Sequence, residues 1–456
     1  MNIVGPDTGA MADLVRVHRV GIVRQTLRRL PDGRYTVQAF GEAADLAPLA
    51  GAGYTVETVE EVAPPGLGGA EGGAPGGRGP GPAGYMDVDE VDRRMAALVA
   101  GPDGAVTELI ELPRPTWEGR TCRALRIGRG PAPGRPGVCV LGGVHAREWG
   151  SADIVVGFAE RLLAAWRGKR GITIGRRRFT ATQVLRLVEE ANVYLVPQVN
   201  PDGRHHSFTV DPMWRKNRRP APRGAAAGDG TCVGVDLNRN FDFLWDFTAH
   251  FDPDAPVACS TEPCHPEVYV GPEAVSEPEV ANVVWLLDRY PDIAYLVDLH
   301  SYGELIMYSW GDDENQSRRP TMAFTNADWD GRRGRPDDDY REYIGAADRR
   351  LLVRLATKMQ AAVTAARGRT YRVQQSMNLY PTAGTSDDYA FSRHLVDPSR
   401  TKVLAFTVEW GAEDNPTPFH PPYDEMVRII AEVTSGLLAF CGEALRIGVP
   451  DPPPQE

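Results

Sequence analysis

The chain has 456 residues, of which 42% are hydrophobic and 24% are charged, a usual balance for a folded protein with a substantial core. Its 50 basic and 61 acidic residues give a formal net charge of −11, which argues against a nucleic-acid partner because the phosphate backbone needs a basic face. No apolar run reaches the roughly 18 residues that a membrane span requires, so no membrane partner is expected.

The N-terminal part of the chain is predicted to be a small α+β unit followed by a linker. Between residues 64 and 84, 15 of 21 residues are Gly or Pro, a composition typical of a flexible linker. Within residues 1–63, alternating hydrophobicity predicts strands at 15–22, 35–40 and 54–59, with a helix at 42–50. Residues 1–30 contain no continuous apolar stretch of the kind found in signal peptides, so no secretory signal is expected.

The remainder, residues 85–456, is predicted to form one large α/β domain. Four apolar runs have the length of buried strands, at residues 138–144, 193–199, 294–299 and 403–408. Helical periodicity lies between or after them, at residues 87–99, 152–166, 277–288, 340–366 and 423–445. This alternation predicts a mixed, mostly parallel twisted sheet with helices on both faces.

Reactive polar residues stand at the end of each of these four runs. His145 and Glu148 follow the first run, Asp202 follows the second, His300 follows the third and Glu409 follows the fourth. In open α/β sheets, ligands bind beyond the carboxyl ends of the strands. The four endings therefore predict one functional site at a single edge of the sheet.

His145, Glu148 and His300 are candidates for a zinc site. Two imidazoles and one carboxylate leave a fourth tetrahedral position open to water, which is the arrangement of a catalytic zinc. Taken singly, each of these residues fits an ordinary structural role, and their shared position favours the metal. A ligating histidine usually donates its other ring N–H to an acceptor, and Asp236 and Asp298 are both candidates for that acceptor.

Glu409 and a group of arginines extend this candidate site. A carboxylate at the end of an apolar strand is costly unless it is paired or used. Beside a metal, Glu409 could activate water as a general base, with a structural salt bridge as the alternative. Arg147, Arg215 and Arg239 lie in motifs near these positions, and arginine suits carboxylate recognition and oxyanion stabilisation. An anionic group on the substrate is therefore expected.

The stretch from Tyr85 to about residue 446 resembles the zinc metallocarboxypeptidases of the carboxypeptidase A/B type. The supporting motifs occur in the family's order: HAREW at 145–149, NPDG at 200–203, WRKNR at 214–218, CVGVDLNRN at 232–240, HSY at 300–302, Tyr380 followed by GTSDD at 384–388, and Glu409. Together they are far more specific than any single motif. The resemblance implies a zinc-dependent exopeptidase with one zinc per chain, whose partners are the C-termini of peptides or proteins.

The resemblance also implies which residues perform catalysis. By position, His145, Glu148 and His300 would hold the zinc. Glu409 would be the general base that activates the zinc-bound water and then passes on its proton. Arg215 would polarise the scissile carbonyl and stabilise the oxyanion.

Further residues would bind the substrate, again as the resemblance implies. Asn238, Arg239 and Tyr380 would bind the C-terminal carboxylate, and Tyr380 would close over it. Arg147 and Tyr302 would line the subsites on the amino side of the scissile bond. These assignments agree with the anionic group expected from the arginines.

The resemblance extends to the neighbourhood of Asp236, which would accept the second ring N–H of His145. Cys232 and Cys264 resemble a family pair that forms a disulfide, although Cys259 could compete for either partner. A bridge would indicate an oxidising compartment. Without a visible signal peptide the cytoplasm is the default location, and an extracellular one is open if Cys232 and Cys264 are oxidised.

Specificity rests on Asp387, which falls where the family places the base of the pocket for the C-terminal side chain. A carboxylate there would favour Lys or Arg. The alternative is that Asp387 or its neighbour caps the following helix. Met307 and Gly311 would leave apolar room, which keeps mixed specificity open. Residues 312–339 look like an insertion that forms either a flap beside the site or a disordered loop.

Two other functions are compatible with the motifs. The first is a peptidoglycan-type or isopeptide-type amide hydrolase, which the carboxylate-binding set of Asn238, Arg239 and Tyr380 disfavours. The second is a non-catalytic binding relative, which the presence of both Glu148 and Glu409 disfavours. The oligomeric state is not indicated by the sequence.

Overall fold

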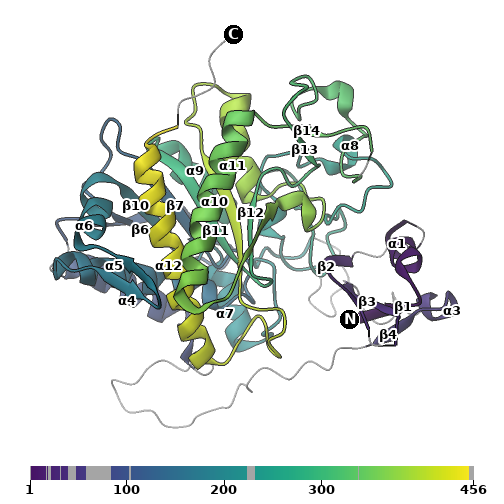
Figure 1. Cartoon of the computed structure of the whole chain (residues 1–456), viewed down its shortest axis with the longest axis horizontal. Helices are drawn as coiled ribbons and strands as arrows, with labels where there is room; N and C mark the ends of the chain where they lie inside the picture. Colours follow the sequence, from purple (N-terminus) through teal and green to yellow (C-terminus); the bar gives the residue numbers. More distant parts are fainter. Residues whose placement is uncertain are drawn as a thin grey trace.

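A computed structural model describes residues 2–16, 18, 22–30, 32–39, 48–57, 84–101, 104–222, 232–336 and 338–450. Its main feature is an eight-stranded sheet (Figure 1). In spatial order the strands are β15 (Arg372–Gln375), β12 (Leu305–Tyr308), β16 (Leu404–Trp410), β11 (Ile293–Ser301), β7 (Gly137–Gly142), β10 (Asn192–Val196), β6 (Thr121–Ile127) and β5 (Thr107–Pro115).

The four central strands β16, β11, β7 and β10 are parallel to one another. They are the four apolar runs of the sequence, and nearly every one of their residues is buried, as expected for strands covered on both faces. Antiparallel β12 and β6 flank them. The predicted mixed, mostly parallel sheet is therefore confirmed, and the four strand ends meet at one edge.

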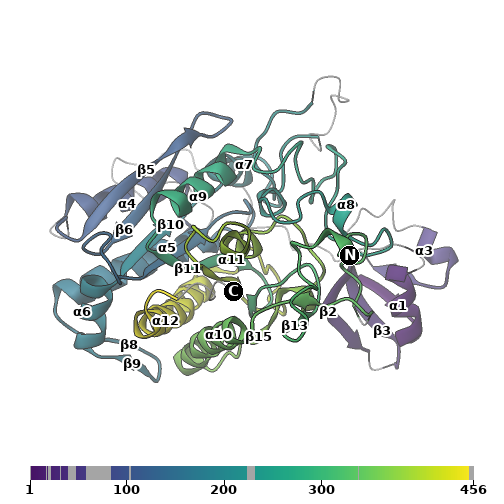
Figure 2. The ribbon, with the colours of Figure 1, turned by 90° about the horizontal axis from the view of Figure 1, so that it is seen from above.

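Helices cover both faces of this sheet (Figure 2). One face carries α4 (Val88–Ala100), α5 (Gly150–Arg167), α6 (Ala181–Glu190), α10 (Ala346–Arg367) and α12 (Tyr423–Ile447). The other carries α9 (Pro278–Arg289) and α11 (Ser386–Val396), with the four-residue α8 (Phe247–His250) beyond them. Helix α7 (Pro201–Thr209) follows β10 and contacts α4. No helix in the described part of the chain has both the length and the apolar character needed to cross a bilayer.

The insertion and the start of α10 differ from the sequence prediction. The helix predicted at 340–366 begins at Ala346, because β14 (Glu342–Tyr343) pairs with β13 (Asn315–Gln316) just before it. Apart from residue 337, which lies outside the described residues, the insertion at 312–339 is packed rather than a disordered loop. It contains a short 3-10 helix (Ala327–Trp329) and a fully buried arginine, Arg333.

The N-terminal region forms a separate four-stranded antiparallel sheet, in the order β2-β3-β1-β4. Its elements are β1 (Asn2–Gly5), α1 (Thr8–Arg16), β2 (Ile22–Arg29), β3 (Tyr35–Ala39), α3 (Pro48–Gly51) and β4 (Thr55–Glu57). The strand predicted at 15–22 is wrong at its start, where α1 extends to Arg16, and the central strand β1 was not predicted. The first part of the helix predicted at 42–50, and residues 64–83 of the predicted linker, lie outside the described residues.

A small β-hairpin and two hydrophobic cores complete the fold. The hairpin pairs β8 (Ile172–Ile174) with β9 (Arg177–Phe179). The main core fills both sides of the eight-stranded sheet, and the N-terminal sheet has its own core built around Ile3, Leu14 and Val37. The two cores share no residue, which agrees with the expected small α+β unit.

Helix α12 is expected to be a main source of stability because Phe440 packs from it onto the sheet. Phe440 is fully buried, with its ring centroid 5.2 Å from that of Phe406 and 6.1 Å from that of Tyr295. We expect Phe440→Ala to lower the free energy of unfolding by about 3–5 kcal/mol in urea titrations. Val427→Ala on the same helix, where the side chain is 51% exposed, should change it by less than about 0.5 kcal/mol. Equal losses would contradict this packing.

Candidate active site

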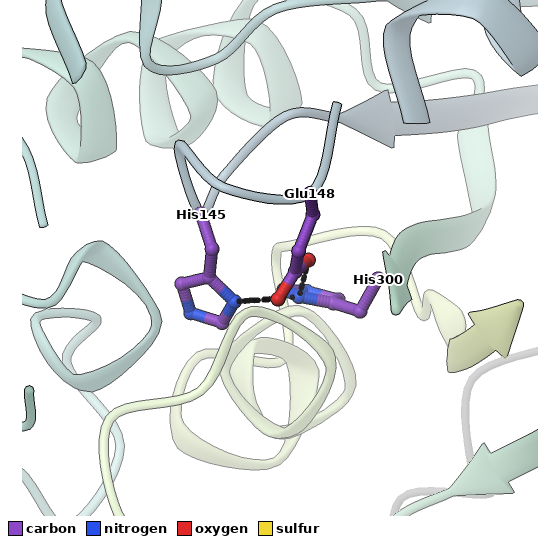
Figure 3. Close-up of side chains that lie close together, drawn as sticks. All are labelled: His145, Glu148 and His300. Atoms are coloured by element: carbon purple, nitrogen blue, oxygen red, sulfur yellow. Dashed lines mark hydrogen bonds and ion pairs between the residues drawn. The ribbon is translucent and has the colours of Figure 1, made fainter. Parts of the chain in front are cut away.

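His145, Glu148 and His300 converge at the carboxyl edge of the central strands (Figure 3). His145 and Glu148 lie in the loop after β7, and His300 is the penultimate residue of β11. One ligand atom from each lies within 4.8 Å of the other two. Across the described ranges, no other three His, Cys, Asp or Glu side chains come together in this way.

The spacing of these three side chains fits a single zinc ion. His145 Nδ1 lies 2.8 Å from Glu148 Oε1 and 3.0 Å from His300 Nδ1, and His300 Nδ1 lies 3.1 Å from Glu148 Oε2. Two tetrahedral ligands bound at about 2.0–2.1 Å are roughly 3.3 Å apart. All three residues are buried. The donor set, two imidazoles and one carboxylate, is therefore already gathered around one point.

Each histidine has a carboxylate at its second ring nitrogen. His145 Nε2 lies 3.2 Å from Asp236 Oδ1, and His300 Nε2 lies 3.0 Å from Asp298 Oδ2. Such partners fix the ring orientation and the tautomer, so that Nδ1 of each ring faces the site. Both acceptors considered from the sequence are thus in use, one for each histidine.

The charges around the candidate ligands compensate one another. Burial opposes ionisation of Glu148, but the adjacent His145 and His300 outweigh it and hold the pKa of this carboxyl well below its usual range. Burial likewise opposes ionisation of Asp236, and Arg215 followed by His145 reverses that effect and lowers its pKa. These carboxylates are therefore charged at neutral pH, as a cation site requires.

Glu409 stands beside this group without a partner of its own. It pairs in register with His300 across β16 and β11, and it is the only residue of β16 that is not fully buried. No ion pair within 4 Å reaches it from the described residues, so the salt-bridge alternative finds no support there. Burial of the carboxyl and the nearby charge of Glu148 raise its pKa to about 8. A bound cation would act in the opposite direction.

The arginines expected near the site are held by specific acceptors. Arg215 donates from Nε and Nη2 to Asp236 Oδ2, at 3.1 and 2.8 Å. Arg239 donates from Nε to the carbonyl of Ala258 at 2.6 Å and from Nη1 to the carbonyl of Asn238 at 2.7 Å. Its guanidinium lies 5.9 Å from the ring centroid of Tyr380. Asn238, Arg239 and Tyr380 are therefore brought together.

Arg147 contacts two residues that the sequence did not indicate, Glu267 and Phe419, and Phe419 also contacts Tyr302. Arg147 donates from both terminal nitrogens to Glu267, each at 2.7 Å, and lies 4.5 Å above the ring of Phe419. The rings of Tyr302 and Phe419 are 5.0 Å apart. Glu267 follows Cys264 by three residues, a proximity that could have suggested it, whereas nothing local marks Phe419.

The Cys232–Cys264 disulfide and the residues that follow β10 hold loops around the site without joining it. Cys232 and Cys264 are bonded, while Cys259 is free and half-buried. The side-chain amide of Asn200 donates to the carbonyls of Val144 and Lys216, at 3.2 and 3.1 Å, and so holds the loop that leads to His145. Asp202 accepts hydrogen bonds from Thr116 and from the backbone of Glu118 instead of joining the site.

Asp387 and Asp388 lie in the first turn of α11, but neither caps that helix. The N-cap is Thr385, which makes no side-chain capping bond. Asp387 Oδ2 accepts a hydrogen bond from Ser376 Oγ at 3.1 Å, and Asp388 Oδ2 accepts one from the backbone of Gly311 at 2.8 Å. Both carboxyl groups are buried. The capping alternative is therefore wrong, and Asp387 is bound on one oxygen by Ser376.

The chain is similar to known proteins in sequence and in fold. The family model described as zinc carboxypeptidase matches residues 102–435. Carboxypeptidase B of Astacus astacus is 31% identical over 72% of this chain and 88% of its own length. Inactive metallocarboxypeptidase ECM14 of Arthroderma otae is 33% identical over 43% of this chain, which spans only 30% of that protein. The crystal structure of carboxypeptidase A from Helicoverpa armigera has the same fold, with a TM-score of 0.67, 19% identity and coverage of 98% of this chain and 97% of that one.

Zinc binding can be tested on the ligands directly. We expect the purified protein to carry one zinc per chain and His300→Ala to lose it, because two remaining ligands cannot close a tetrahedral site. Zinc should raise the melting temperature of the wild type, since a ligand that binds only the folded state stabilises it. His205→Ala, an exposed histidine on α7, is the control. Metal analysis showing unchanged zinc in His300→Ala would rule out this site.

Proposed function

Because the chain belongs to the zinc carboxypeptidase family, we propose that it hydrolyses the C-terminal peptide bond of peptides or proteins. The observation that carries this proposal is the position of Glu409. Its carboxyl group has no ion-pair partner among the described residues and lies in register beside His300, next to three side chains spaced for one zinc. A carboxylate in that place serves no evident structural purpose and suits proton transfer.

Glu409 and Arg215 would have different roles in the hydrolysis. When bound, zinc would polarise the scissile carbonyl and lower the pKa of water at the site. Glu409 takes a proton from the attacking water and delivers it to the leaving amine, since no ion pair among the described residues holds its carboxyl group. Arg215 stabilises the oxyanion, since Asp236 holds its Nε and Nη2 while Nη1 has no hydrogen bond among the described residues.

Recognition of a free C-terminus would restrict the reaction to the last peptide bond. Arg239 is fixed by the carbonyls of Ala258 and Asn238, so its guanidinium needs little reorganisation to bind a carboxylate. The side-chain carbonyl of Asn238 accepts a hydrogen bond from the backbone of Ser386 at 2.8 Å, which leaves its amide nitrogen for the substrate. Tyr380 is only half-buried beside them, as a residue that closes over a substrate should be.

For the C-terminal side chain, we propose a preference for Lys or Arg. Asp387 is a buried carboxylate that receives one hydrogen bond, from Ser376, and no cation of the described chain pairs with it. A buried carboxylate without a counterion is unfavourable, so a cationic substrate side chain would supply the missing charge. Met307 belongs to a small apolar cluster with Leu305 and Leu379 that packs against Tyr380, and we expect it to contact the stem of a Lys or Arg side chain.

A non-catalytic binding function is the second candidate, because one matching relative carries the name of an inactive metallocarboxypeptidase. The presence of both Glu148 and Glu409 favours catalysis over that alternative. A peptidoglycan-type or isopeptide-type amide hydrolase is disfavoured by the grouping of Asn238, Arg239 and Tyr380, which suits a free C-terminal carboxylate.

Replacing Glu409 separates catalysis from binding. Glu409→Gln removes the proton acceptor and keeps the shape, so kcat should fall by about 10²- to 10⁴-fold. Zinc content should stay at one per chain. Glu190→Gln, an exposed residue at the end of α6, is the matched control and should keep full activity. Steady-state kinetics with unchanged turnover in Glu409→Gln would remove the general-base assignment.

Replacing Asp387 tests the preference for basic residues. Asp387→Asn should lower kcat/KM for peptides ending in Lys or Arg by about 10- to 100-fold, the worth of a hydrogen bond to a charged group. Peptides ending in Leu should be hydrolysed as well as before or better. An equal loss for all C-terminal residues would mean that Asp387 is structural.

A further inference from the structure

Behind Asp387 lies a group of four fully buried carboxyl groups, which we name the carboxyl cluster. Its members are Asp312, Asp313, Glu342 and Asp388. The first two begin the insertion, the third lies in β14 at its end, and the fourth is the neighbour of Asp387 in α11. The insertion therefore does more than extend a loop, because it supplies two of the four carboxyl groups and leads into the strand that supplies a third.

The carboxyl cluster is in direct contact with the residues around Asp387. The backbone of Gly311 donates to Asp388 Oδ2 at 2.8 Å. A Cβ atom at Gly311 would lie 2.6 Å from Thr382 Oγ1, 2.9 Å from Asp388 Oδ2 and 3.4 Å from Ser376 Cβ. Ser376 is the residue that binds Asp387. Glycine at 311 is thus what lets the cluster approach the side of the pocket proposed for the C-terminal side chain.

Positive charge is scarce in the carboxyl cluster. Arg333 is the only cation that faces it from the described residues, with Nε 3.9 Å from Asp312 Oδ2 and 3.7 Å from Glu342 Oε2. The closest contact of Arg333 is with Asp330, at 2.7 Å. Both oxygens of Asp312 and Oδ1 of Asp388 are buried without a well-formed hydrogen bond in the described structure. One guanidinium cannot neutralise this many carboxylates.

Protons supply the rest of the compensation at neutral pH. Burial raises the pKa of Asp313 to about 8, and Asp312 beside it adds to this effect. Burial also raises the pKa of Glu342 and of Asp388, with the charge of a neighbouring aspartate acting in the same direction on each. Burial raises the pKa of Asp312 as well, and the Arg333 guanidinium acts against this effect.

Several other polar groups, from the insertion and from α11, lie next to the carboxyl cluster. The titratable and charged ones are Asp330, Arg333 and Asp338 of the insertion, Tyr340 just after it, and Asp387 of α11. The neutral donors include the hydroxyl of Tyr340, which donates to Glu342 at 2.6 Å, and the backbone of Gly334, which donates to Asp313 at 2.8 Å. None of these groups adds a second positive charge.

We infer that the carboxyl cluster selects substrates with a cationic C-terminal side chain, and that it does so more strongly as the pH rises. This inference rests on the proposed function. A cation beside Asp387 supplies the positive charge that the cluster lacks. As the pH rises, the cluster loses protons and becomes more negative, so its attraction for that cation increases.

The test compares two peptides that differ only in ending with Arg or Leu. At each pH we take the ratio of their kcat/KM values. This ratio is not affected by groups whose ionisation changes the hydrolysis of both peptides equally. From pH 6 to pH 9 the ratio should rise about three- to tenfold for the wild type, which is the effect of one charge several ångströms away. In Asp312→Asn the ratio should be lower and should rise less with pH, and in Asp312→Glu part of the rise with pH should return. Asp339→Asn, which removes an exposed charge from the same insertion, should match the wild type.

Each outcome decides a different point. Suppose that the Leu peptide is hydrolysed and that the Arg-to-Leu ratio of kcat/KM changes with pH in the same way in the wild type and in Asp312→Asn. This result would overturn the role of the carboxyl cluster and leave the proposed function intact. Hydrolysis of neither peptide overturns the proposed function and this inference with it. If Asp312→Asn does not fold, calorimetry of the wild type in two buffers provides the test. Binding of free arginine should release protons, binding of leucine should not, and equal proton release would contradict the inference.

Discussion

A buried carboxylate is tolerated only when a cation, a proton or hydrogen-bond donors compensate it, and this requirement organises the whole carboxyl edge of the sheet. Parallel strands β7, β11 and β16 deliver His145, His300 and Glu409 to one place. Glu148 lies between two imidazoles there, and Asp236 between an imidazole and Arg215. Each of these two carboxylates therefore has cationic or hydrogen-bonding partners.

The proposed function follows from the places where compensation is incomplete. Three ligand side chains converge with the spacing of a zinc site. Glu409 has no ion pair in the described structure, which supports the proposed proton transfer. Among the described residues Asp387 accepts a hydrogen bond from Ser376 and has no counterion, which a substrate cation would provide. The carboxyl cluster behind it is similar, because in the described part of the chain Arg333 is the one cation that faces its four carboxyl groups.

The sequence predicted the parts of this arrangement that depend on local pattern. Apolar runs marked the four central strands, and the polar residues after them marked the candidate ligands and Glu409. It could not predict Phe419, because this residue comes from a loop whose position depends on tertiary packing around Arg147, and only its proximity to Cys264 could have suggested Glu267. The start of α10 was misplaced because Glu342 and Tyr343 have no helix-breaking signal of their own and become a strand only by pairing with β13.

The most direct test of the account is mass spectrometry of a peptide library with varied C-termini, incubated with the protein before and after chelation and again after zinc is restored. The account predicts removal of single residues from free C-termini, with Arg and Lys removed fastest, no cleavage of amidated C-termini, loss of activity on chelation and recovery with zinc. Internal cleavage, or removal of residues that continues unchanged in the chelated protein, would contradict it.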